Sequence, residues 1–369
     1  MQNNHVTVLE INQDALDFNF NFFNSKLNPA TKILVVVKAF GYGLEAIEIA
    51  KQFENKAAYF AVAYTAEGIA LRNAGINAPI IVLHPQKQNI ESIINHCLEP
   101  NIYALSLLNE MLTVAKQKQL HNYPVHIKFN TGLNRLGFNE NETSELTACI
   151  NSQSQLQIAS VFSHIAASED LNEKEFTQYQ IKAFNTCFNK LTAELTYTPI
   201  KHLLNTSGII NYASQAQFDM VRLGIGLYGF GNTEKETKKL KNVLCLKSVI
   251  SQIHTIKKGD TVGYNRAFIA NQTVKTATIP IGHADGISRK LGNENGYIFI
   301  NNQKAPIIGN VCMDMLMVNI TGIDCNEGDE VFVYKNQQHI EQLAANCQTI
   351  PYELLTAISQ RVKRVLKKS

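Results

Sequence analysis

The 369-residue chain has no tryptophan, no C-x-x-C pair and no run of eighteen apolar residues. Its seven cysteines are odd in number and lie far apart, so neither a disulfide framework nor a zinc site is indicated. The first residues, Met1–His5, lack the charged start and apolar core of a signal peptide, and no stretch is long and apolar enough to span a membrane. We therefore expect free thiols, no metal, no membrane partner and a cytoplasmic location.

A strong excess of one charge is also missing. The chain carries 34 Lys and Arg against 31 Asp and Glu, which gives a net charge of +3. Its one cationic cluster is the tail Arg361, Lys363, Arg364, Lys367 and Lys368. A nucleic-acid partner is therefore not indicated.

Short apolar runs alternate with longer amphipathic stretches through the first two thirds of the chain, which is typical of βα units around a buried parallel sheet. The stretch Thr65–Ala74, for example, is followed by Gly75, as expected at the end of a helix. Eight strands with helices in about 230 residues predict an α/β fold, a (β/α)8 barrel. The predicted strands are Ile33–Lys38, Tyr59–Tyr64, Pro79–His84, Ile102–Ser106, Val125–Asn130, Ile158–His164, His202–Thr206 and Met220–Leu223.

The pattern changes near Lys241, where β-rich runs separated by Gly, Asp and Asn turns predict a second, mainly-β domain. We assign residues 1–240 to the barrel and 241–369 to this domain; a first strand at about 6–11 is a candidate to pack with the second domain. Its predicted strands are Lys247–Ile256, Lys275–Ile281, Tyr297–Ile300 and Glu330–Tyr334, and its predicted helices are Ile340–Cys347 and Tyr352–Leu366.

Lys38 closes the first predicted barrel strand, directly before a glycine-spaced loop. Active sites of such barrels lie at the C-terminal ends of the strands. A sheltered lysine there can lose its proton and attack an aldehyde, which is the basis of Schiff-base chemistry. Strand position alone equally allows a lysine that extends its amine to water at the barrel rim.

The segment Val36-Val37-Lys38-Ala39-x-x-Tyr42-Gly43 resembles the attachment motif for pyridoxal 5'-phosphate (PLP) of fold-type III enzymes, and the chain resembles alanine racemase over nearly its whole length. Further matching segments are Lys128–Phe138, Met220–Gly229, Val262–Tyr264, Ile281–Gly286 and Val311–Asp314. The resemblance implies a bacterial homodimer with shared active sites that interconverts L-alanine and D-alanine and supplies D-alanine for peptidoglycan.

By this resemblance, Lys38 binds PLP and acts as the base on one face of the substrate, and Tyr264 from the partner subunit acts on the other. A phenol has a reference pKa of about 10 and must be tuned to act as a base near neutrality. The family pattern implies a chain from Tyr264 through His164 to Arg222, with Arg222 against the pyridine nitrogen. Because arginine keeps its proton, the pyridine should stay largely neutral, which favours simple reprotonation of the α-carbon.

The glycines around Ile225 let backbone amides approach a phosphate, although they would equally form a tight turn. Loops after the last two strands of such barrels commonly form a phosphate site. The residues assigned by resemblance to the cofactor, besides Lys38, His164 and Arg222, are Tyr42, Asn205, Thr206, Gly224, Ile225 and Tyr352.

Lys128 is predicted to point into the barrel, where a bare ammonium group would be costly. Many family members carry a carboxylated lysine at this position, and the resulting anion could pair with Arg135; an ordinary hydrogen-bonded lysine is the alternative. By the same resemblance, Arg135 orients the substrate carboxylate and the phenolic oxygen of the cofactor. Met313 of the partner subunit would present its backbone amide to that carboxylate.

The match departs from the family pattern at several positions: Phe40, Leu44-Glu45, Asn130, Thr206 and His283. Thr206 keeps the hydroxyl that a phosphate needs, whereas His283 bears on the selectivity for the substrate side chain.

Three other functions are alternatives. A non-catalytic PLP-binding module resembles the barrel alone and has no counterpart of Tyr264 or Met313. A fold-type III decarboxylase typically places a carboxylate, not Arg222, at the ring nitrogen. A racemase of serine as well as alanine stays open, because pockets discriminate poorly against one added hydroxyl.

Overall fold

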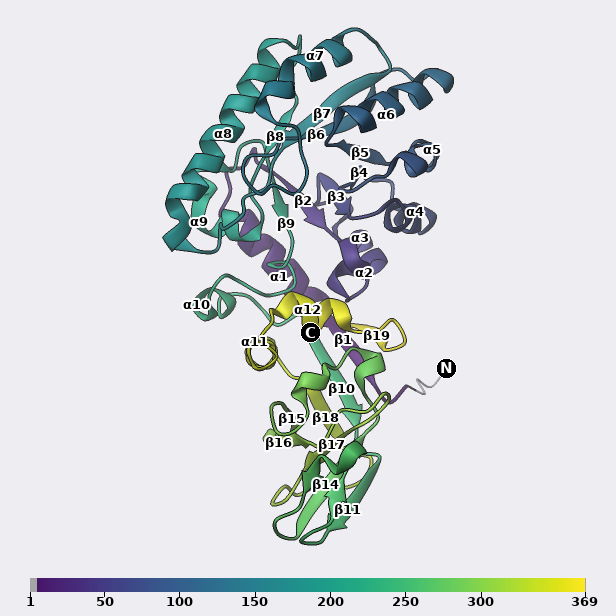
Figure 1. Cartoon of the computed structure of the whole chain (residues 1–369), viewed down its shortest axis with the longest axis vertical. Coiled ribbons are helices and arrows are strands. Elements are labelled where there is room, and N and C mark those ends of the chain that lie inside the picture. The colour runs from purple at the N-terminus through teal and green to yellow at the C-terminus, as the bar shows by residue number, and fades with distance from the viewer. Residues whose placement is uncertain (1–4, 369) are drawn as a thin grey trace.

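The computed structural model describes residues 5–368 and shows two bodies stacked along one axis. Residues 1–4 and 369, at the outer ends of the two predicted domains, lie outside the described residues. In Figure 1 the helix-covered barrel occupies one end, the β domain occupies the other, and helices α11 and α12 lie between them.

The first body is a closed barrel in which strands β2 to β9 follow one another in chain order, and every neighbouring pair is parallel. This confirms the predicted (β/α)8 barrel. The strands are β2 Lys32–Val36, β3 Tyr59–Val62, β4 Ile80–Val82, β5 Glu99–Ile102, β6 Tyr123–Lys128, β7 Leu156–Phe162, β8 Ile200–His202 and β9 Met220–Leu223.

Helices follow the strands and surround the barrel (Figure 1). They are α1 Gln13–Asn24, α2 Lys38–Tyr42, α3 Ala46–Phe53, α4 Thr65–Asn73, α5 Ile90–Asn95, α6 Leu105–Gln117, α7 Thr143–Asn151, α8 Lys174–Ala193, α9 Thr206–Ala216 and α10 Glu234–Thr237. Short 3-10 turns are η1 Lys87–Asn89, η2 Glu140–Glu142 and η3 Leu171–Glu173.

The prediction of the fourth barrel strand at Ile102–Ser106 was wrong. The strand is β5, Glu99–Ile102, and Leu105 already begins α6. The apolar run continues from the strand into the first helical turn, so hydrophobicity alone does not mark the boundary.

The second body is a nine-stranded sheet in the order β11-β14-β17-β16-β15-β18-β10-β1-β19, with the small pair β12-β13 beside it. Its mainly-β character agrees with the prediction. The strands are β1 Val8–Asn12, β10 Leu244–Val249, β11 Gln252–Ile256, β12 Thr261–Val262, β13 Phe268–Ile269, β14 Val274–Ile279, β15 Tyr297–Ile300, β16 Gln303–Ile308, β17 Leu316–Asn319, β18 Glu330–Tyr334 and β19 Lys363–Lys367. The remaining elements are η4 Tyr264–Arg266, η5 His283–Asp285, η6 Arg289–Leu291, α11 Gln337–Asn346 and α12 Pro351–Ala357.

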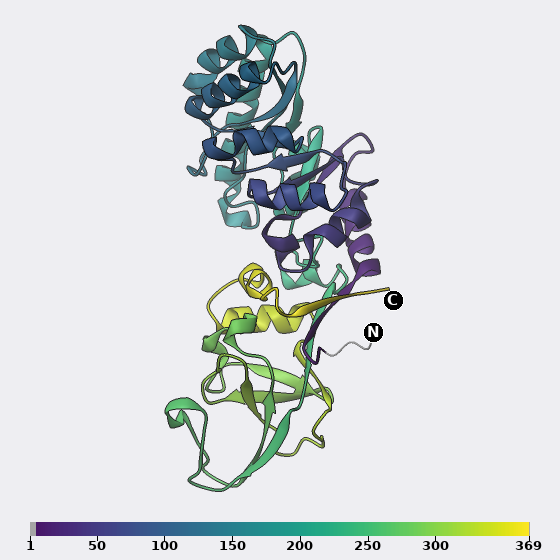
Figure 2. The same cartoon turned by 90° about the vertical axis from the view of Figure 1, so that its right-hand side faces the viewer.

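The first and last strands of the described residues pair in this sheet. Strand β1 pairs antiparallel with β10 and parallel with β19, so the chain starts in the second body before it enters the barrel (Figure 2). The helix predicted over Tyr352–Leu366 was therefore wrong in its second half. The helix ends at Ala357. The tail forms strand β19, because its backbone N–H and C=O groups pair with those at the free edge of β1.

The predicted strand Lys247–Ile256 was also wrong as a single element. It divides into β10 and β11, which lie at distant positions in the sheet order. Between these two strands, the backbone N–H of Ile250 donates to the carbonyl of Asp329, and the chain turns away from β10.

Candidate active site

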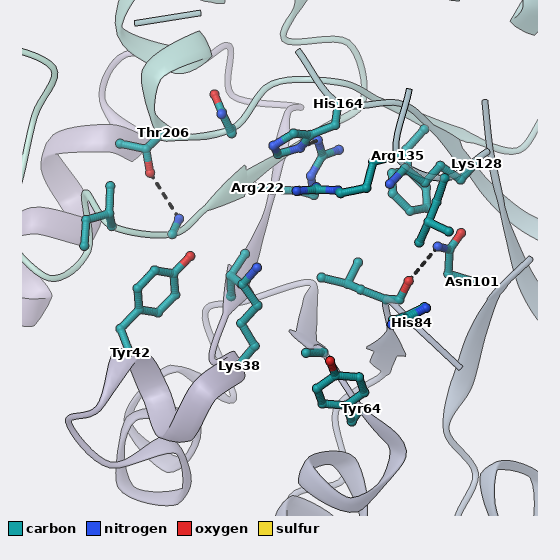
Figure 3. A pocket seen from close by; sticks show the side chains of 18 of the residues that line it. Lys38, Tyr42, Tyr64, His84, Asn101, Lys128, Arg135, His164, Thr206 and Arg222 are labelled. Atoms are coloured by element: carbon teal, nitrogen blue, oxygen red, sulfur yellow. Dashed lines mark hydrogen bonds between the residues drawn. The ribbon is translucent and has the colours of Figure 1, made fainter. Parts of the chain in front are cut away.

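A cavity of about 570 Å³ opens at the C-terminal ends of the barrel strands. Figure 3 shows Lys38 and Tyr42 reaching toward it from one side and Arg222 and His164 lying opposite. Four lysine and arginine side chains line the cavity and no carboxylate does, so it suits an anionic ligand. The lining residues are Val36, Lys38, Tyr42, Ala63, Tyr64, Leu83, His84, Asn101, Lys128, Arg135, Leu136, Phe162, His164, Asn205, Thr206, Arg222, Gly224, Ile225 and Tyr352.

Lys38 lies at the start of an unusual backbone turn. The next residues Ala39, Phe40 and Gly41 have φ values of 52°, 55° and 64°, which form a left-handed turn that L-residues rarely adopt. A Cβ on Gly41 would lie 2.9 Å from the backbone nitrogen of Ala46, so the turn packs tightly on the next helix. The tight turn fixes the backbone from which the Lys38 side chain enters the cavity.

The electrostatic surroundings of Lys38 favour its neutral amine. Burial, followed by the positive charges of Arg135 and Arg222, lowers the pKa of Lys38, and Glu67 opposes this in part. A lysine with a lowered pKa has more of the free amine that attacks a carbonyl or accepts a proton.

Arg222 is buried beneath the cavity and holds His164. Its Nη2 donates to the His164 Nδ1 at 3.1 Å and also to the carbonyls of Ser163 and Leu203, at 2.8 and 2.7 Å. Burial lowers the pKa of Arg222 to about 9, so it stays charged at neutral pH. Burial and the charge of Arg222 lower the pKa of His164 well below its ordinary value, so this imidazole is neutral and accepts at Nδ1.

Thr206 organises the loop after β9. Its Oγ1 accepts hydrogen bonds from the backbone N–H groups of Gly224 and Gly226, at 3.1 and 3.2 Å. A Cβ on Gly224 would lie only 2.6 Å from the hydroxyl of Tyr42, so a glycine is needed where this hydroxyl and the loop meet. Ile225 lines the same corner of the cavity. Hydroxyls and main-chain amides are the groups that bind phosphate in such barrels.

Two further residues complete this corner. Asn205 caps α9, accepting from the Gly208 N–H at 2.8 Å, and so directs the first turn of the helix at the cavity. Tyr352 comes from α12 of the second body, and its ring centroid lies 6.0 Å from that of Tyr42. Burial raises the pKa of Tyr352 to about 12, so its hydroxyl stays a donor.

Lys128 and Arg135 lie together on another side of the cavity (Figure 3). Lys128 is 7% exposed, and its Nζ lies 5.9 Å from the ring centroid of Phe162, with no carboxylate bound to it among residues 5–368. Burial, then the charges of Arg135, Arg222 and Lys38, lower the pKa of Lys128 to about 8. Because Lys128 and Arg135 are neighbouring cations without a paired anion, this side of the cavity favours an anionic group between them.

Tyr264 and Met313 do not line the cavity of their own chain. Both lie on the second body and are 74% and 59% exposed. They belong to neighbouring segments, since the side chain of Asn310 donates to the Tyr264 carbonyl at 3.1 Å. One chain alone therefore does not bring them together with Lys38.

Sequence reasoning did not single out Tyr64, His84 and Asn101, although all three line the cavity. Tyr64 and His84 ended predicted strands, a position that marks the mouth of a barrel, and this signal was available. Asn101 was missed because its strand was placed three residues late. It donates to the Leu83 carbonyl at 2.7 Å, and its buried Oδ1 has no partner among the described residues.

No group of three or more His, Cys, Asp and Glu side chains in residues 5–368 could hold a metal ion, and no helix there is long and apolar enough to cross a membrane. All seven cysteines are free.

Family models for the alanine racemase N-terminal domain and C-terminal domain match residues 11–231 and 243–366. An alanine racemase of Helicobacter pylori (strain Shi470) is 33% identical over 371 residues, covering 97% of this chain and 98% of the relative. The solved alanine racemase of Clostridium difficile 630 is 32% identical, with a TM-score of 0.93 over 100% of this chain and 97% of that one. A Bartonella henselae alanine racemase with covalently bound pyridoxal phosphate is 29% identical, with a TM-score of 0.87 over 98% and 99% of the two chains.

Proposed function

Because the chain belongs to the alanine racemase family, whose members depend on PLP, we propose that it interconverts L-alanine and D-alanine with two bases, Lys38 and Tyr264 of the partner subunit. The proposal rests on one observation. Lys38, whose pKa is lowered, lies at the mouth of a cavity that is lined by four cationic side chains and by no carboxylate.

The cavity fits the cofactor at each of its functional groups. Lys38 would hold the aldehyde carbon, and the corner of Tyr42, Thr206 and Gly224 would hold the phosphate. Arg222 would face the pyridine nitrogen, since its Nε makes no hydrogen bond among the described residues. Bound PLP supplies the electron withdrawal that makes the α-hydrogen of an amino acid acidic. The other members of the proposed set are Asn205, Ile225 and Tyr352.

The two proposed bases act on opposite faces of the α-carbon. The amine of Lys38 takes or returns the proton on one face, which its lowered pKa favours. The hydroxyl of Tyr264 of the partner subunit does the same on the other. His164 supports this role, because its Nδ1 is held by Arg222 while its Nε2 has no hydrogen-bond partner among the described residues.

The substrate carboxylate would be bound by Arg135, which is exposed at the cavity and forms no ion pair among residues 5–368. The guanidinium fork suits a carboxylate in two parallel hydrogen bonds. The backbone amide of Met313 of the partner subunit would add a third donor.

A homodimer with shared sites follows from these roles, because Tyr264 and Met313 lie outside their own chain's cavity. The second body exposes them together with other large apolar side chains, Ile269 at 62% and Met315 at 50%. Apolar side chains gathered on one body are typical of a surface that another protein covers. We further propose that the enzyme supplies D-alanine for peptidoglycan in a bacterial cytoplasm, where its unpaired cysteines suit a reducing environment.

Lys128 is proposed to be carboxylated. Its neutral amine, favoured by a pKa of about 8, would attack the carbon of CO₂; an N–C bond forms, one C–O π bond breaks and a nitrogen proton passes to solvent. The product is an anion beside Arg135. Labelling with ¹³C-bicarbonate at neutral pH should give a carbamate NMR signal that Lys128→Met lacks; wild-type protein without this signal would contradict the proposal.

Two of the other functions weighed are less well supported. A decarboxylase of this barrel type would place a carboxylate at the ring nitrogen, and no carboxylate lines the cavity. A binding module limited to the barrel does not account for the match to the C-terminal domain over residues 243–366.

The test is conversion of L-alanine to D-alanine by purified protein supplied with PLP, with L-serine alongside to measure substrate breadth. Tyr264→Phe should lose alanine turnover while it still binds PLP. Tyr297→Phe is the matched control, because its hydroxyl makes no hydrogen bond among the described residues and it lies on β15. Turnover retained in Tyr264→Phe, or by protein that sedimentation shows to be monomeric at the assay concentration, would overturn the two-base proposal.

A further inference from the structure

A chain of buried polar side chains crosses the barrel interior below the cavity. The five strands β9, β8, β7, β6 and β5 each contribute one member. In order these are Arg222, His202, Ser160, His126 and Glu99, and the hydrogen-bond distances between them are 3.1, 3.0, 2.6 and 2.8 Å. Barrel interiors are usually filled by branched apolar side chains, so four adjacent polar contacts there are a departure that needs a reason.

The chain is buried except at its carboxylate end, which is partly exposed. His202, Ser160 and His126 are 0% exposed, Arg222 is 4% exposed, and the side chain of Glu99 is 12% exposed. Buried polar groups are costly unless each is satisfied, and a fully satisfied network specifies one arrangement.

With a neutral His126, each hydrogen bond between the two ends has one direction. A guanidinium only donates, so His202 must accept at Nδ1 and carry its proton at Nε2. That proton goes to the Ser160 hydroxyl, which in turn donates to the Nδ1 of His126. His126 then carries its proton at Nε2 and donates it to the carboxylate of Glu99.

The electrostatics agree with this assignment. Burial, followed by the charge of Arg222, lowers the pKa of His202 well below its ordinary value, so this ring is neutral and has one acceptor nitrogen. Arg222 forms no ion pair with a carboxylate among residues 5–368. Glu99 is thus the anion to which the buried cation is connected.

We propose that Glu99 is a positioning residue that acts on Arg222 through this relay, holding the guanidinium in place and keeping it charged beside the ring nitrogen of the cofactor. The inference rests on the proposed function, which places Arg222 at that nitrogen. The relay works because hydrogen bonds aligned in one direction polarise one another, by about 10–30% per bond, so the negative charge of Glu99 stabilises the protonated guanidinium. It also holds the guanidinium plane, since Nη1 is bound to His202 while Nη2 is bound to His164.

The relay can be tested by the ¹⁵N resonance of the pyridine nitrogen in the holoenzyme reconstituted with ¹⁵N-labelled PLP. Glu99→Gln keeps the shape and one acceptor but removes the charge, and Ser160→Ala breaks the relay without changing any charge. Both should shift the resonance in the direction of stronger hydrogen bonding to the ring nitrogen, and by a smaller amount than Arg222→Lys, because a guanidinium that donates less to His202 donates more to the ring. Glu91→Gln is the matched control, because this exposed glutamate pairs with Lys118 on the barrel exterior and should leave the resonance unchanged.

The outcomes separate the relay from the function on which it rests. If Arg222→Lys shifts the resonance and Glu99→Gln does not, the relay is wrong and the placement of Arg222 stands. If Arg222→Lys causes no shift either, the placement of Arg222 itself is wrong.

A second measurement needs no variant and therefore tests the relay even if the variants fold poorly. The ¹⁵N-histidine spectrum of wild-type protein should show His126 and His202 as neutral rings protonated at Nε2. An imidazolium signal for His126 would overturn the relay, because Ser160 would then accept from both rings and pass no polarisation.

Discussion

The carboxylate of Glu67 accepts a hydrogen bond from the backbone N–H of Ala39, with 2.6 Å between Oε1 and the nitrogen, directly after Lys38. Its other oxygen accepts from the N–H groups of Ala63 and Tyr64, at 2.7 and 3.1 Å. One side chain therefore joins the left-handed turn after β2 to the end of β3. Left-handed residues other than glycine cost about 1–2 kcal/mol each, so the turn depends on such contacts.

Glu67→Ala should destabilise the protein by about 2 kcal/mol, because it leaves three backbone donors without their charged acceptor. It should also weaken PLP binding, since Lys38 is no longer held in place. Denaturant unfolding of the apoprotein and equilibrium dialysis of PLP measure the two effects. Glu48→Ala, which removes only an exposed pair with Lys51, is the control. Equal PLP affinity in both variants would contradict the positioning role.

Gly224→Ala should weaken PLP binding at least tenfold, because its Cβ would lie 2.6 Å from the Tyr42 hydroxyl. The double variant with Tyr42→Phe separates packing from binding. The next atom of Tyr42, Cζ, lies 3.4 Å from the Cβ, so removal of the hydroxyl should restore thermal stability but not PLP affinity. If Tyr42→Phe restores neither, the clash is not the cause.

Lys128 should make the stability of CO₂-free apoprotein depend on pH. Its pKa is about 8 in the folded chain, below the ordinary 10.5, so protonation favours unfolding. The cost is fully present below pH 8, falls as the pH rises and is gone by about 10.5. The difference in unfolding free energy between wild type and Lys128→Met should therefore shift by about 3 kcal/mol in favour of wild type between pH 7 and 10.5. A constant difference, as expected for the exposed control Lys51→Met, would refute this.

Arg364→Ala should destabilise the junction of the two bodies by about 2 kcal/mol. From β19 its guanidinium donates to the Gly43 carbonyl at 2.6 Å and to the carbonyls of Ile358, Ser359 and Val362, at 2.8, 2.5 and 2.6 Å. Hydrogen exchange should show faster opening of the loop after Lys38, which the Gly43 contact anchors. Arg364→Lys keeps the charge but not the planar fork and should recover only part of the protection. Unchanged exchange in Arg364→Ala would show that this contact does not hold the loop.

Six of the eight predicted barrel strands overlap the observed strands by three or more residues, whereas the predicted fourth and seventh strands share only Ile102 with β5 and only His202 with β8. Such strands are apolar on both faces, and turn residues bound them, so local sequence is enough to find them. The fourth strand and the tail at Lys363–Lys367 were misplaced. In both, the local pattern fits a helix and a strand equally, and pairing with a distant segment decides between them.

The sequence by itself determined the barrel and the β domain, because alternation is a local property of the chain, and its resemblance to a known family supplied the residues expected to meet at the cavity. Tertiary structure alone decided that Glu67 would hold the turn after Lys38 and that five strands would align Arg222 with Glu99. These relationships join residues far apart in sequence, and no local preference encodes the register that brings them within hydrogen-bond distance.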